Sequence, residues 1–143
     1  MDESSRRILY SLGQLDVYLR ELENHLPKSF SQYEKNLEKK RFCERTLQLM
    51  IEICIDISQL LVKELKLGLP TEEESVFEKL EQSKVISPAL KRKLIEMKKF
   101  RNVLIHKYTG IIDRLVYGHA TKEKNDFINF KKEIIAYLKK GIG

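Results

Sequence analysis

The most apolar stretch of the chain is residues 47–62, which read LQLMIEICIDISQLLV. Placed on a helix, the apolar residues of this stretch cover most of the circumference, whereas a helix at the surface of a globular protein needs one apolar stripe. Five polar residues interrupt the stretch, so it is not suited to cross a membrane. It therefore predicts a helix that other parts of the protein cover on more than one side.

Two arrangements provide that cover. Because a chain of 143 residues encloses few positions completely, we expect the helix to pack inside its own bundle on one side and against a second copy of the chain on the other. The alternative is a central core helix within a monomer. The expected assembly is a homodimer that associates through this long apolar second helix.

Helix signals extend from this stretch in both directions. Residues 4–26 carry apolar side chains at alternating spacings of four and three, which is typical of one buried helical stripe, and Pro27 follows. The second helix is predicted from residue 29 or 31 to about residue 66. Gly68 and Pro70 then stop it, as a glycine followed by a proline does at many helix ends.

The second half of the chain predicts shorter helices. Thr71 and Glu74 match a capping box that opens a third helix. Ser87 and Pro88 match the N-cap and first position of a fourth helix, which ends at residues 109–110. A short element near residues 112–117 and a last helix that starts between residues 121 and 126 follow. The sequence thus predicts one all-α domain over residues 1–143, an up-down bundle of about five to six helices.

The composition excludes several other classes of protein. Hydrophobic residues make up 42% of the chain and charged residues 34%, which suits a globular domain. The first residues lack the basic and then apolar pattern of a signal peptide, so we expect none. Cys43 and Cys54 are too few for a disulfide framework and lack zinc-ligand spacing. We expect a cytoplasmic protein with no membrane partner.

Positive charge is concentrated in one part of the sequence. Residues 84–112 hold eight Lys and Arg residues against the single acid Glu96, while the whole chain has a net charge of +6. The rest of the chain is therefore close to neutral. Such a local excess is typical of a surface that binds a polyanion. The alternative is a solvated, lysine-rich helix face.

Two residues in this basic segment suggest chemistry. Arg101 falls on the apolar stripe of its helix, where it either extends its head to water or is fixed beside a phosphate. An acid of the second helix, Glu52 or Asp56, is our guess for compensating its charge. His106 is a candidate general acid or base. The two lie about 140° apart around an ideal helix, so they meet only if the helix end distorts or a second subunit completes the site.

No pattern in the sequence indicates a metal or a cofactor. His25 and His119 are interpreted as structural or simply exposed, because a lone histidine on a helix more often has such a role. No two histidines have the spacing of metal ligands, and no cluster of carboxylates suggests a divalent ion. We therefore expect metal-independent chemistry.

The segment from Arg101 to Tyr108 reads R-N-x-x-x-H-x-Y. This motif resembles the signature of the HEPN ribonucleases, specifically the HepT-type toxins of prokaryotic toxin–antitoxin pairs. The surrounding sequence is similar as well, in residues 42–49 and 55–57 of the second helix, in the connections at 68–70 and 85–86, and in residues 111–112 beyond the motif. The similarity covers nearly the whole chain and is weakest in the first helix and at residues 119–126.

The resemblance implies a specific activity. HepT-like proteins are helical bundles that dimerise so that two motifs face a shared basic cleft, and they are regarded as metal-independent endoribonucleases acting on tRNA or mRNA. By motif position, His106 is the acid or base in attack by the ribose 2′-OH, Arg101 stabilises the phosphorane-like transition state, and Asn102 fixes local geometry. The product is a 2′,3′-cyclic phosphate, and DNA is not cut because it lacks the 2′-OH.

The resemblance also implies a partner and a means of silencing. A minimal nucleotidyltransferase antitoxin transfers AMP to the tyrosine of this motif, here Tyr108; the alternative is a core tyrosine, since Tyr108 also falls on the apolar stripe. The resemblance and the charge pattern together predict RNA contacts by Lys91, Arg92, Lys98, Lys99 and Lys107.

Two other functions remain open at this point. The first is a non-catalytic HEPN subunit that holds a nucleotide or docks a nucleotidyltransferase, which would have less need of His106. The second is a general basic RNA-binding protein, whose function would depend on Lys91, Arg92 and Lys93 and fall steeply with salt.

Overall fold

The structure is a computed structural model that describes residues 2–106 and 111–141. Helices joined by short connections make up these ranges, with no strand in the part described, which confirms the predicted all-α class. The helices are α1 (Glu3–His25), α2 (Phe30–Glu34), α3 (Leu37–Glu64), α4 (Glu73–Gln82), α5 (Pro88–His106), α6 (Ile111–Lys122) and α7 (Lys124–Gly141). No helix among the described residues is both long enough and apolar enough to span a membrane.

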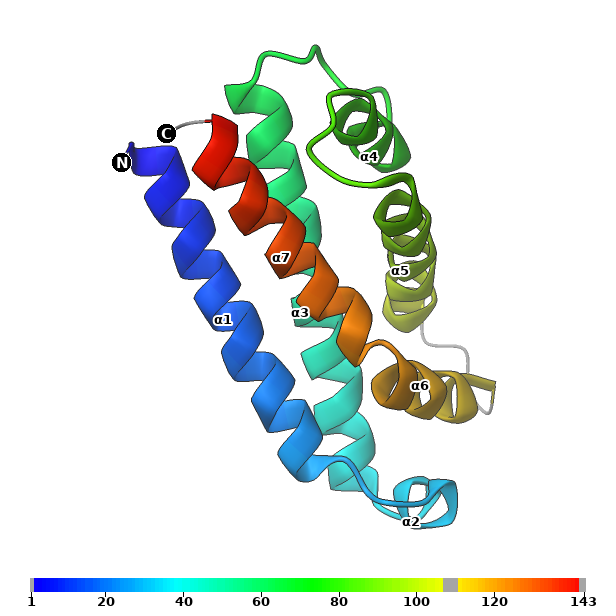
Figure 1. Cartoon of the computed structure of the whole chain (residues 1–143). Coiled ribbons are helices and arrows are strands. Elements are labelled where there is room, and N and C mark those ends of the chain that lie inside the picture. Colours follow the sequence, from blue (N-terminus) through cyan, green and yellow to red (C-terminus); the bar gives the residue numbers. More distant parts are fainter. Residues whose placement is uncertain (1, 107–110, 142–143) are drawn as a thin grey trace.

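Helix α3 is the axis of the bundle. It packs against α1, α2, α4, α5 and α6. Figure 1 shows α1 and α7 on one side of α3 and helices α4, α5 and α6 on the other, with α2 at the far end. The beginning of α1 and the end of α7 lie at the same end of the bundle. The motif helix α5 therefore lies on the side opposite α1.

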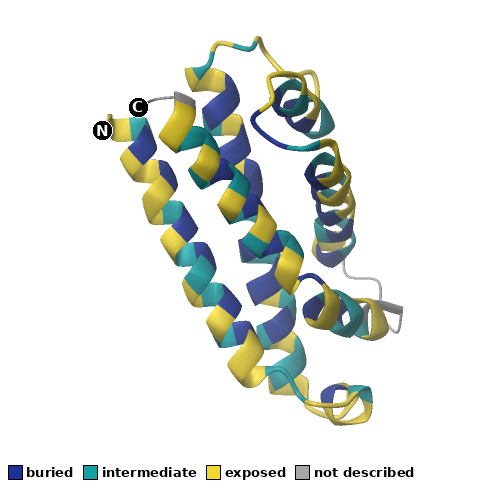
Figure 2. Cartoon of the chain, in the orientation of Figure 1, coloured by how far each residue is buried: buried dark blue, intermediate teal, exposed yellow. Residues whose placement is uncertain are grey.

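The apolar stretch at residues 47–62 is buried mainly by its own chain. Leu47, Met50 and Cys54 are each fully buried, and the dark inner faces of the helices in Figure 2 converge on α3. Leu49, Ile53 and Leu60 stay partly exposed. Within one chain α3 is thus a central core helix, as the alternative interpretation had it. Burial of residues 47–62 alone therefore does not require a second subunit. The homodimer stays a prediction.

The predicted second helix is two helices, α2 and α3, and the break explains why the described residues form seven helices rather than the predicted five or six. Ser29 caps α2, because its Oγ accepts a hydrogen bond from the backbone N–H of Gln32 at 3.2 Å. Asn36 then caps α3 by accepting from the backbone N–H of Lys39 at 3.0 Å. An asparagine side chain competes with the helical backbone in this way, so a new helix begins there.

The third helix begins one position later than predicted, so the expected capping box of Thr71 and Glu74 is wrong. Glu72 is the N-cap, and its backbone N–H donates to Ser75 Oγ at 3.3 Å. The shift places Glu73 and Glu74 in the first helical turn of α4. Their carboxylates are thus available to neighbouring helices.

The start of α5 is confirmed at Pro88, with Ser87 as its cap. Ser87 Oγ accepts from the backbone N–H of Leu90 at 3.1 Å. Glu133 of α7 in turn holds Ser87 in place, because its two carboxylate oxygens accept hydrogen bonds from the backbone N–H of Ser87 at 2.7 Å and from Ser87 Oγ at 2.9 Å. The last helix of the chain therefore fixes the beginning of α5. The predicted end of this helix at residues 109–110 lies outside the described residues.

Replacing Glu133 by Ala is expected to lower the free energy of unfolding by about 1–2 kcal/mol, because a partly buried, charge-assisted pair of hydrogen bonds at a helix cap is lost. Urea denaturation followed by circular dichroism measures the change. The neighbouring exposed Lys132→Ala is the control, with an expected change within about 0.5 kcal/mol. Equal effects of the two substitutions would show that the Glu133 contact does not stabilise the fold.

Candidate active site on helix α5

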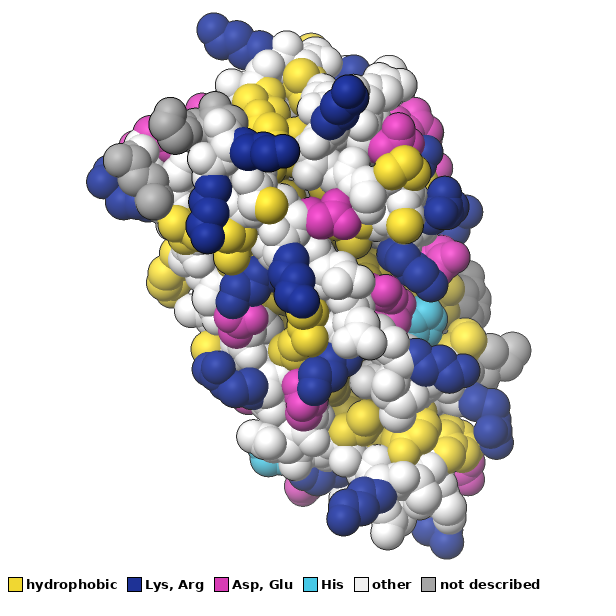
Figure 3. All heavy atoms as spheres, viewed as in Figure 1, with side chains coloured by type: hydrophobic (Ala, Val, Ile, Leu, Met, Phe, Trp, Pro, Cys, Tyr) yellow, Lys and Arg dark blue, Asp and Glu magenta, His cyan; other side chains and the backbone are white. Residues whose placement is uncertain are grey.

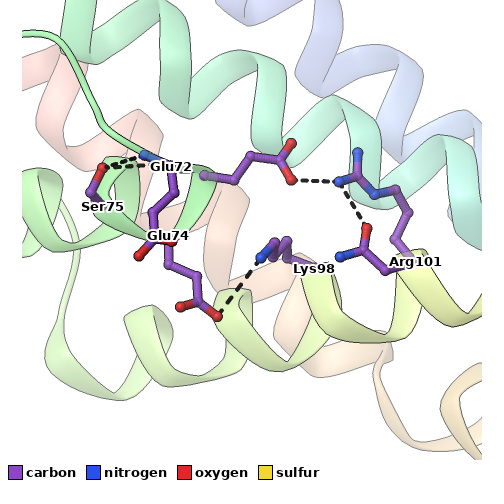
Figure 4. Close-up of polar contacts among 7 residues, drawn as sticks. Glu72, Glu74, Ser75, Lys98 and Arg101 are labelled. Atoms are coloured by element: carbon purple, nitrogen blue, oxygen red, sulfur yellow. Dashed lines mark hydrogen bonds and ion pairs between the residues drawn. The ribbon is translucent and has the colours of Figure 1, made fainter.

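Arg101 is largely buried, and its charged head is held inside the protein. The side chain is 14% exposed. Its Nη2 donates to Glu73 Oε1 at 2.6 Å and to Asn102 Oδ1 at 3.2 Å, as Figure 4 shows from the side of α4 and α5. Nε is buried and has no hydrogen-bond partner among the described residues. The guanidinium is therefore fixed by one edge rather than extended into water.

The ion partner of Arg101 is neither Glu52 nor Asp56, so the expectation that an acid of the second helix compensates its charge is wrong. Asp56 of α3 lies close enough for Arg101 to favour its ionised form, but burial, followed by the neighbouring Glu52, raises the pKa of the Asp56 carboxyl overall. Among the described residues the ion pair of Arg101 is with Glu73. Helix α4 packs against both α3 and α5, which brings its first turn over the Arg101 head.

This contact is one of three ion pairs between α4 and α5, which we call the α4–α5 ladder. Residues 71–83 carry five glutamates against one lysine, so an acidic helix faces a basic one. The ladder consists of Glu73–Arg101 at 2.6 Å, Glu81–Lys91 at 3.0 Å and Glu74–Lys98 at 3.8 Å. The last of these is also drawn in Figure 4. The ladder neutralises the side of α5 that faces α4.

The five cations predicted to contact RNA are thus not equivalent. Lys91 and Lys98 belong to the ladder and are only partly exposed. Arg92 and Lys99 are exposed and form no ion pair with any described residue. Lys107 lies outside the described residues. Of the five, those in the described part of α5 without an ion pair are therefore Arg92 and Lys99; Lys93, which is also exposed, lies 3.8 Å from the exposed Glu96 on the same helix.

His106 is the last residue of α5 and is exposed. Because α5 is helical through His106, its end is not distorted, and ideal geometry keeps Arg101 about 140° away around the helix. Asn102, which accepts a hydrogen bond from Arg101 at the boundary with α4, lies about 40° from His106 and so shares its face, whereas Arg101 does not. One chain therefore does not bring the arginine and the histidine of the motif onto one face. Tyr108 lies outside the described residues.

The remaining histidines and cysteines are packed into other contacts. His25 lies edge-on to Phe42, and His119 stacks on Phe100 with its Nδ1 2.7 Å from Glu123 Oε1. Burial raises the pKa of the Cys43 thiol to about 11, so this thiol is protonated near neutral pH. In the described ranges, no three His, Cys, Asp or Glu side chains are grouped so that they could hold a metal ion.

Sequence reasoning missed Glu73. The signal was present in the run of three glutamates at residues 72–74, directly before the one strongly basic helix of the chain. Opposite charges on consecutive helices joined by a short connection favour packing of the two helices against each other. The partner of Arg101 therefore comes from α4, the acidic helix packed against α5, and not from the core helix α3.

Fold and site together define a helical bundle with an arginine–histidine motif at the end of an exposed helix. The chain belongs to the ribonuclease HepT-like family, whose model matches residues 15–134. A relative from Aphanizomenon flos-aquae, named tRNA nuclease HepT, is 26% identical over 127 residues, which is 89% of this chain and 84% of the relative.

Solved structures share the fold. An AMPylated HEPN toxin of Shewanella oneidensis in complex with an MNT antitoxin superposes with a TM-score of 0.83 at 23% identity, over 95% of this chain and 99% of that one. A cytosolic protein of unknown function from Bacillus subtilis, YutE, superposes with a TM-score of 0.77 at 19% identity, over 97% and 93% of the two chains. At these identities the likeness shows a common architecture.

A double-mutant cycle between Glu73→Gln and Arg101→Ala is expected to give a coupling energy of about 1–2 kcal/mol in urea unfolding, because the two groups form a charge-assisted hydrogen bond that is largely shielded from water. Glu78 offers a matched control, since it lies on α4, is exposed and forms no ion pair with the described residues. The cycle of Glu78→Gln with Arg101→Ala should give a coupling close to zero. Similar couplings in the two cycles would contradict a specific contact.

Proposed function

We propose that this protein is a metal-independent endoribonuclease, the toxin of a toxin–antitoxin pair. The observation that carries the proposal is the complete R-N-x-x-x-H-x-Y motif in the sequence, with Arg101, Asn102 and His106 on α5, in a chain that belongs to the ribonuclease HepT-like family. The proposed site of action is cytoplasmic, with tRNA or mRNA as substrate. The name of the Aphanizomenon relative, a tRNA nuclease, supports tRNA.

In the proposed reaction the RNA supplies its own nucleophile. The ribose 2′-oxygen loses its proton and bonds to the adjacent phosphorus, and the 5′-oxygen of the next nucleotide leaves with a proton, so the products are a 2′,3′-cyclic phosphate and a 5′-hydroxyl. His106 moves the proton. Arg101, whose Nη2 is anchored by Glu73 and Asn102, stabilises the extra negative charge on phosphorus. Anchoring one edge in advance removes the cost of ordering a long side chain during the reaction.

The active unit we propose is a homodimer. Arg101 and His106 lie on different sides of α5, so a single phosphate cannot contact both on one undistorted helix. A second copy that brings its own α5 alongside supplies the missing group of each pair. The partly exposed Leu49, Ile53 and Leu60 of α3 and the half-exposed Ile105 beside His106 are apolar surface that such a partner can cover.

Silencing is proposed to occur by AMP transfer to Tyr108 from a minimal nucleotidyltransferase antitoxin. The likeness to a toxin described as AMPylated and bound to an MNT antitoxin supports it, as does the position of Tyr108 two residues beyond His106. An added adenylate brings a negative charge and a bulky group to the place where RNA phosphate has to bind.

A non-catalytic binding subunit is the second candidate function. The observation that favours it is the Glu73–Arg101 ion pair. A guanidinium already engaged by a carboxylate has fewer donors left for a phosphate in a transition state. A binding subunit has no requirement for His106, so the two candidates differ in one substitution.

Purified protein is expected to cleave total tRNA or an unstructured RNA in EDTA, and His106→Ala is expected to lower the rate by at least about 100-fold, since general acid–base groups contribute about 10²–10⁴-fold. Gel analysis and end-group mass spectrometry measure cleavage and the cyclic phosphate. A DNA oligomer of the same sequence should remain intact. His25→Ala is the control that should leave the rate unchanged.

Light scattering of the same sample at micromolar protein tests the assembly, and a monomer mass would contradict the dimer. Absence of cleavage by an unmodified, well-folded dimer would favour the binding subunit. Cleavage that survives His106→Ala would exclude the catalytic assignment. A loss of function caused by Lys91, Arg92 and Lys93 substitutions alone would indicate a general RNA-binding protein.

Co-expression with a minimal nucleotidyltransferase antitoxin is expected to add one or more AMP groups to Tyr108 and to abolish RNA cleavage. Intact-mass and peptide mass spectrometry locate the modification. Tyr108→Phe should block the mass increase and should still cut RNA in the presence of the transferase. Tyr117→Phe, a tyrosine of α6, is the control that leaves the modification in place. Modification at another residue would contradict the assignment.

A further inference from the structure

An open groove of about 580 Å³ lies where α4, α5 and α7 meet. The buried side chains of Val85 and Ile86 form part of its lining, together with Pro88 at the start of α5 and Tyr137 of α7. Lys84 and Lys140 stand at its edges. The groove thus combines an apolar floor, one aromatic ring and two ammonium groups.

The acids in the groove are already engaged. Glu81 pairs with Lys91 at 3.0 Å, and both carboxylate oxygens of Glu133 accept hydrogen bonds from Ser87. Lys84 and Lys140 are exposed and form no ion pair with any described residue. Because Glu133 is bound only by the neutral Ser87, it keeps its negative charge, and Lys84 and Lys140 together exceed it by one positive charge once Glu81 is paired with Lys91. This small excess favours an anion, and the apolar floor with Tyr137 favours a flat, partly apolar group beside it.

The groove borders α5 at its first residue, Pro88. Arg92, Lys99 and His106 are separated by seven residues each, which is two helical turns, so the three lie on one line along the helix within about 40° of one another. All three are exposed. Pro88, which lines the groove, falls on the same line. The ladder removes Lys91 and Lys98 from this surface, because both are turned toward the acids of α4.

We propose that Lys84, Lys140, Arg92 and Lys99 form a basic track that binds a single strand of RNA and leads it from the groove to His106. The proposal rests on the proposed nuclease function and adds a binding site to it at a distance from the motif. Phosphates lie against the four cations, and one nucleotide occupies the groove with its base beside Tyr137. Figure 3 shows Lys and Arg side chains spread over the whole of the face in view, with acids between them.

The dimensions set a length requirement. Eighteen residues separate Pro88 from His106, which is about 27 Å of helix at 1.5 Å per residue. A strand with a rise of about 3.4 Å per nucleotide spans that distance with about eight nucleotides. A dodecamer can therefore contact both the groove and His106, whereas a tetramer cannot.

The test measures binding, so that it does not depend on cleavage. A fluorescent 2′-O-methyl RNA dodecamer, which has no free 2′-OH, is titrated with full-length protein by anisotropy at several salt concentrations. Lys84→Gln and Lys140→Gln keep most of the side-chain stem and remove the charge. Each is expected to raise the Kd by about threefold to tenfold and to reduce the slope of log Kd against log salt by about 0.7. Lys139→Gln, the adjacent exposed lysine on α7 outside the groove, should change neither.

A 2′-O-methyl RNA tetramer, titrated in the same way, provides the second part of the binding test. If the track is continuous, the dodecamer should bind much more tightly than the tetramer, and combining Lys84→Gln with Lys140→Gln should remove most of that difference. Equal effects of Lys139→Gln and Lys140→Gln, or no change in the salt slope with either groove variant, would overturn the track. Displacement of the dodecamer by AMP alone would assign the groove to a free nucleotide, and equal displacement by polyglutamate would show an unspecific polyanion surface; both would overturn the proposal.

Failure of the track and failure of the nuclease are separate results. If wild-type protein cleaves RNA while the groove variants bind the dodecamer normally, the track is wrong and the nuclease stands. If the groove variants weaken binding as expected while no RNA is cut, the track stands and the protein is a binding subunit.

Discussion

The Glu73–Arg101 ion pair is the contact on which the arrangement of the basic helix depends. Burying a guanidinium in a bundle is costly unless its charge is compensated, and the acidic first turn of α4 meets that requirement. The two further pairs of the ladder lie along the same contact between the helices. Together they orient α5, so that one side of this helix is neutralised and the opposite side is left to solvent.

This orientation separates two kinds of positive charge. Cations that stabilise the fold face α4, and those that can bind a ligand face outward with His106. Charge counting along the sequence cannot make that distinction, because Lys98 and Lys99 are neighbours in the chain and belong to different sides of the helix. The formal excess on residues 84–112 therefore overstates the charge that a nucleic acid meets.

The sequence predicted the all-helical class, the first helix and the start of α5 because each depends on local signals, such as apolar periodicity and the Ser87–Pro88 cap. The sequence-based prediction was wrong where the outcome depends on which of several nearby groups a side chain binds in the folded protein. Asn36 ended one helix and began another inside a segment whose apolar pattern continues across the break, and Glu72 rather than Thr71 capped α4. The partner of Arg101 came from a helix assigned no role in the site, since an ion pair between helices leaves no periodic trace in the sequence.

The cap that Glu133 places on Ser87 has a consequence for the order of synthesis. Residues 88–106 leave the ribosome well before α7, yet the start of their helix is held by a carboxylate of that last helix, and Phe127, Phe130 and Ile134 of α7 complete the core. A nascent chain that lacks α7 has an incomplete core, and the start of its α5 lacks the hydrogen bonds from Ser87 to Glu133. The arginine and histidine of the motif thus reach their final setting only after α7 has been synthesised and packed, and a product truncated before α7 lacks that setting.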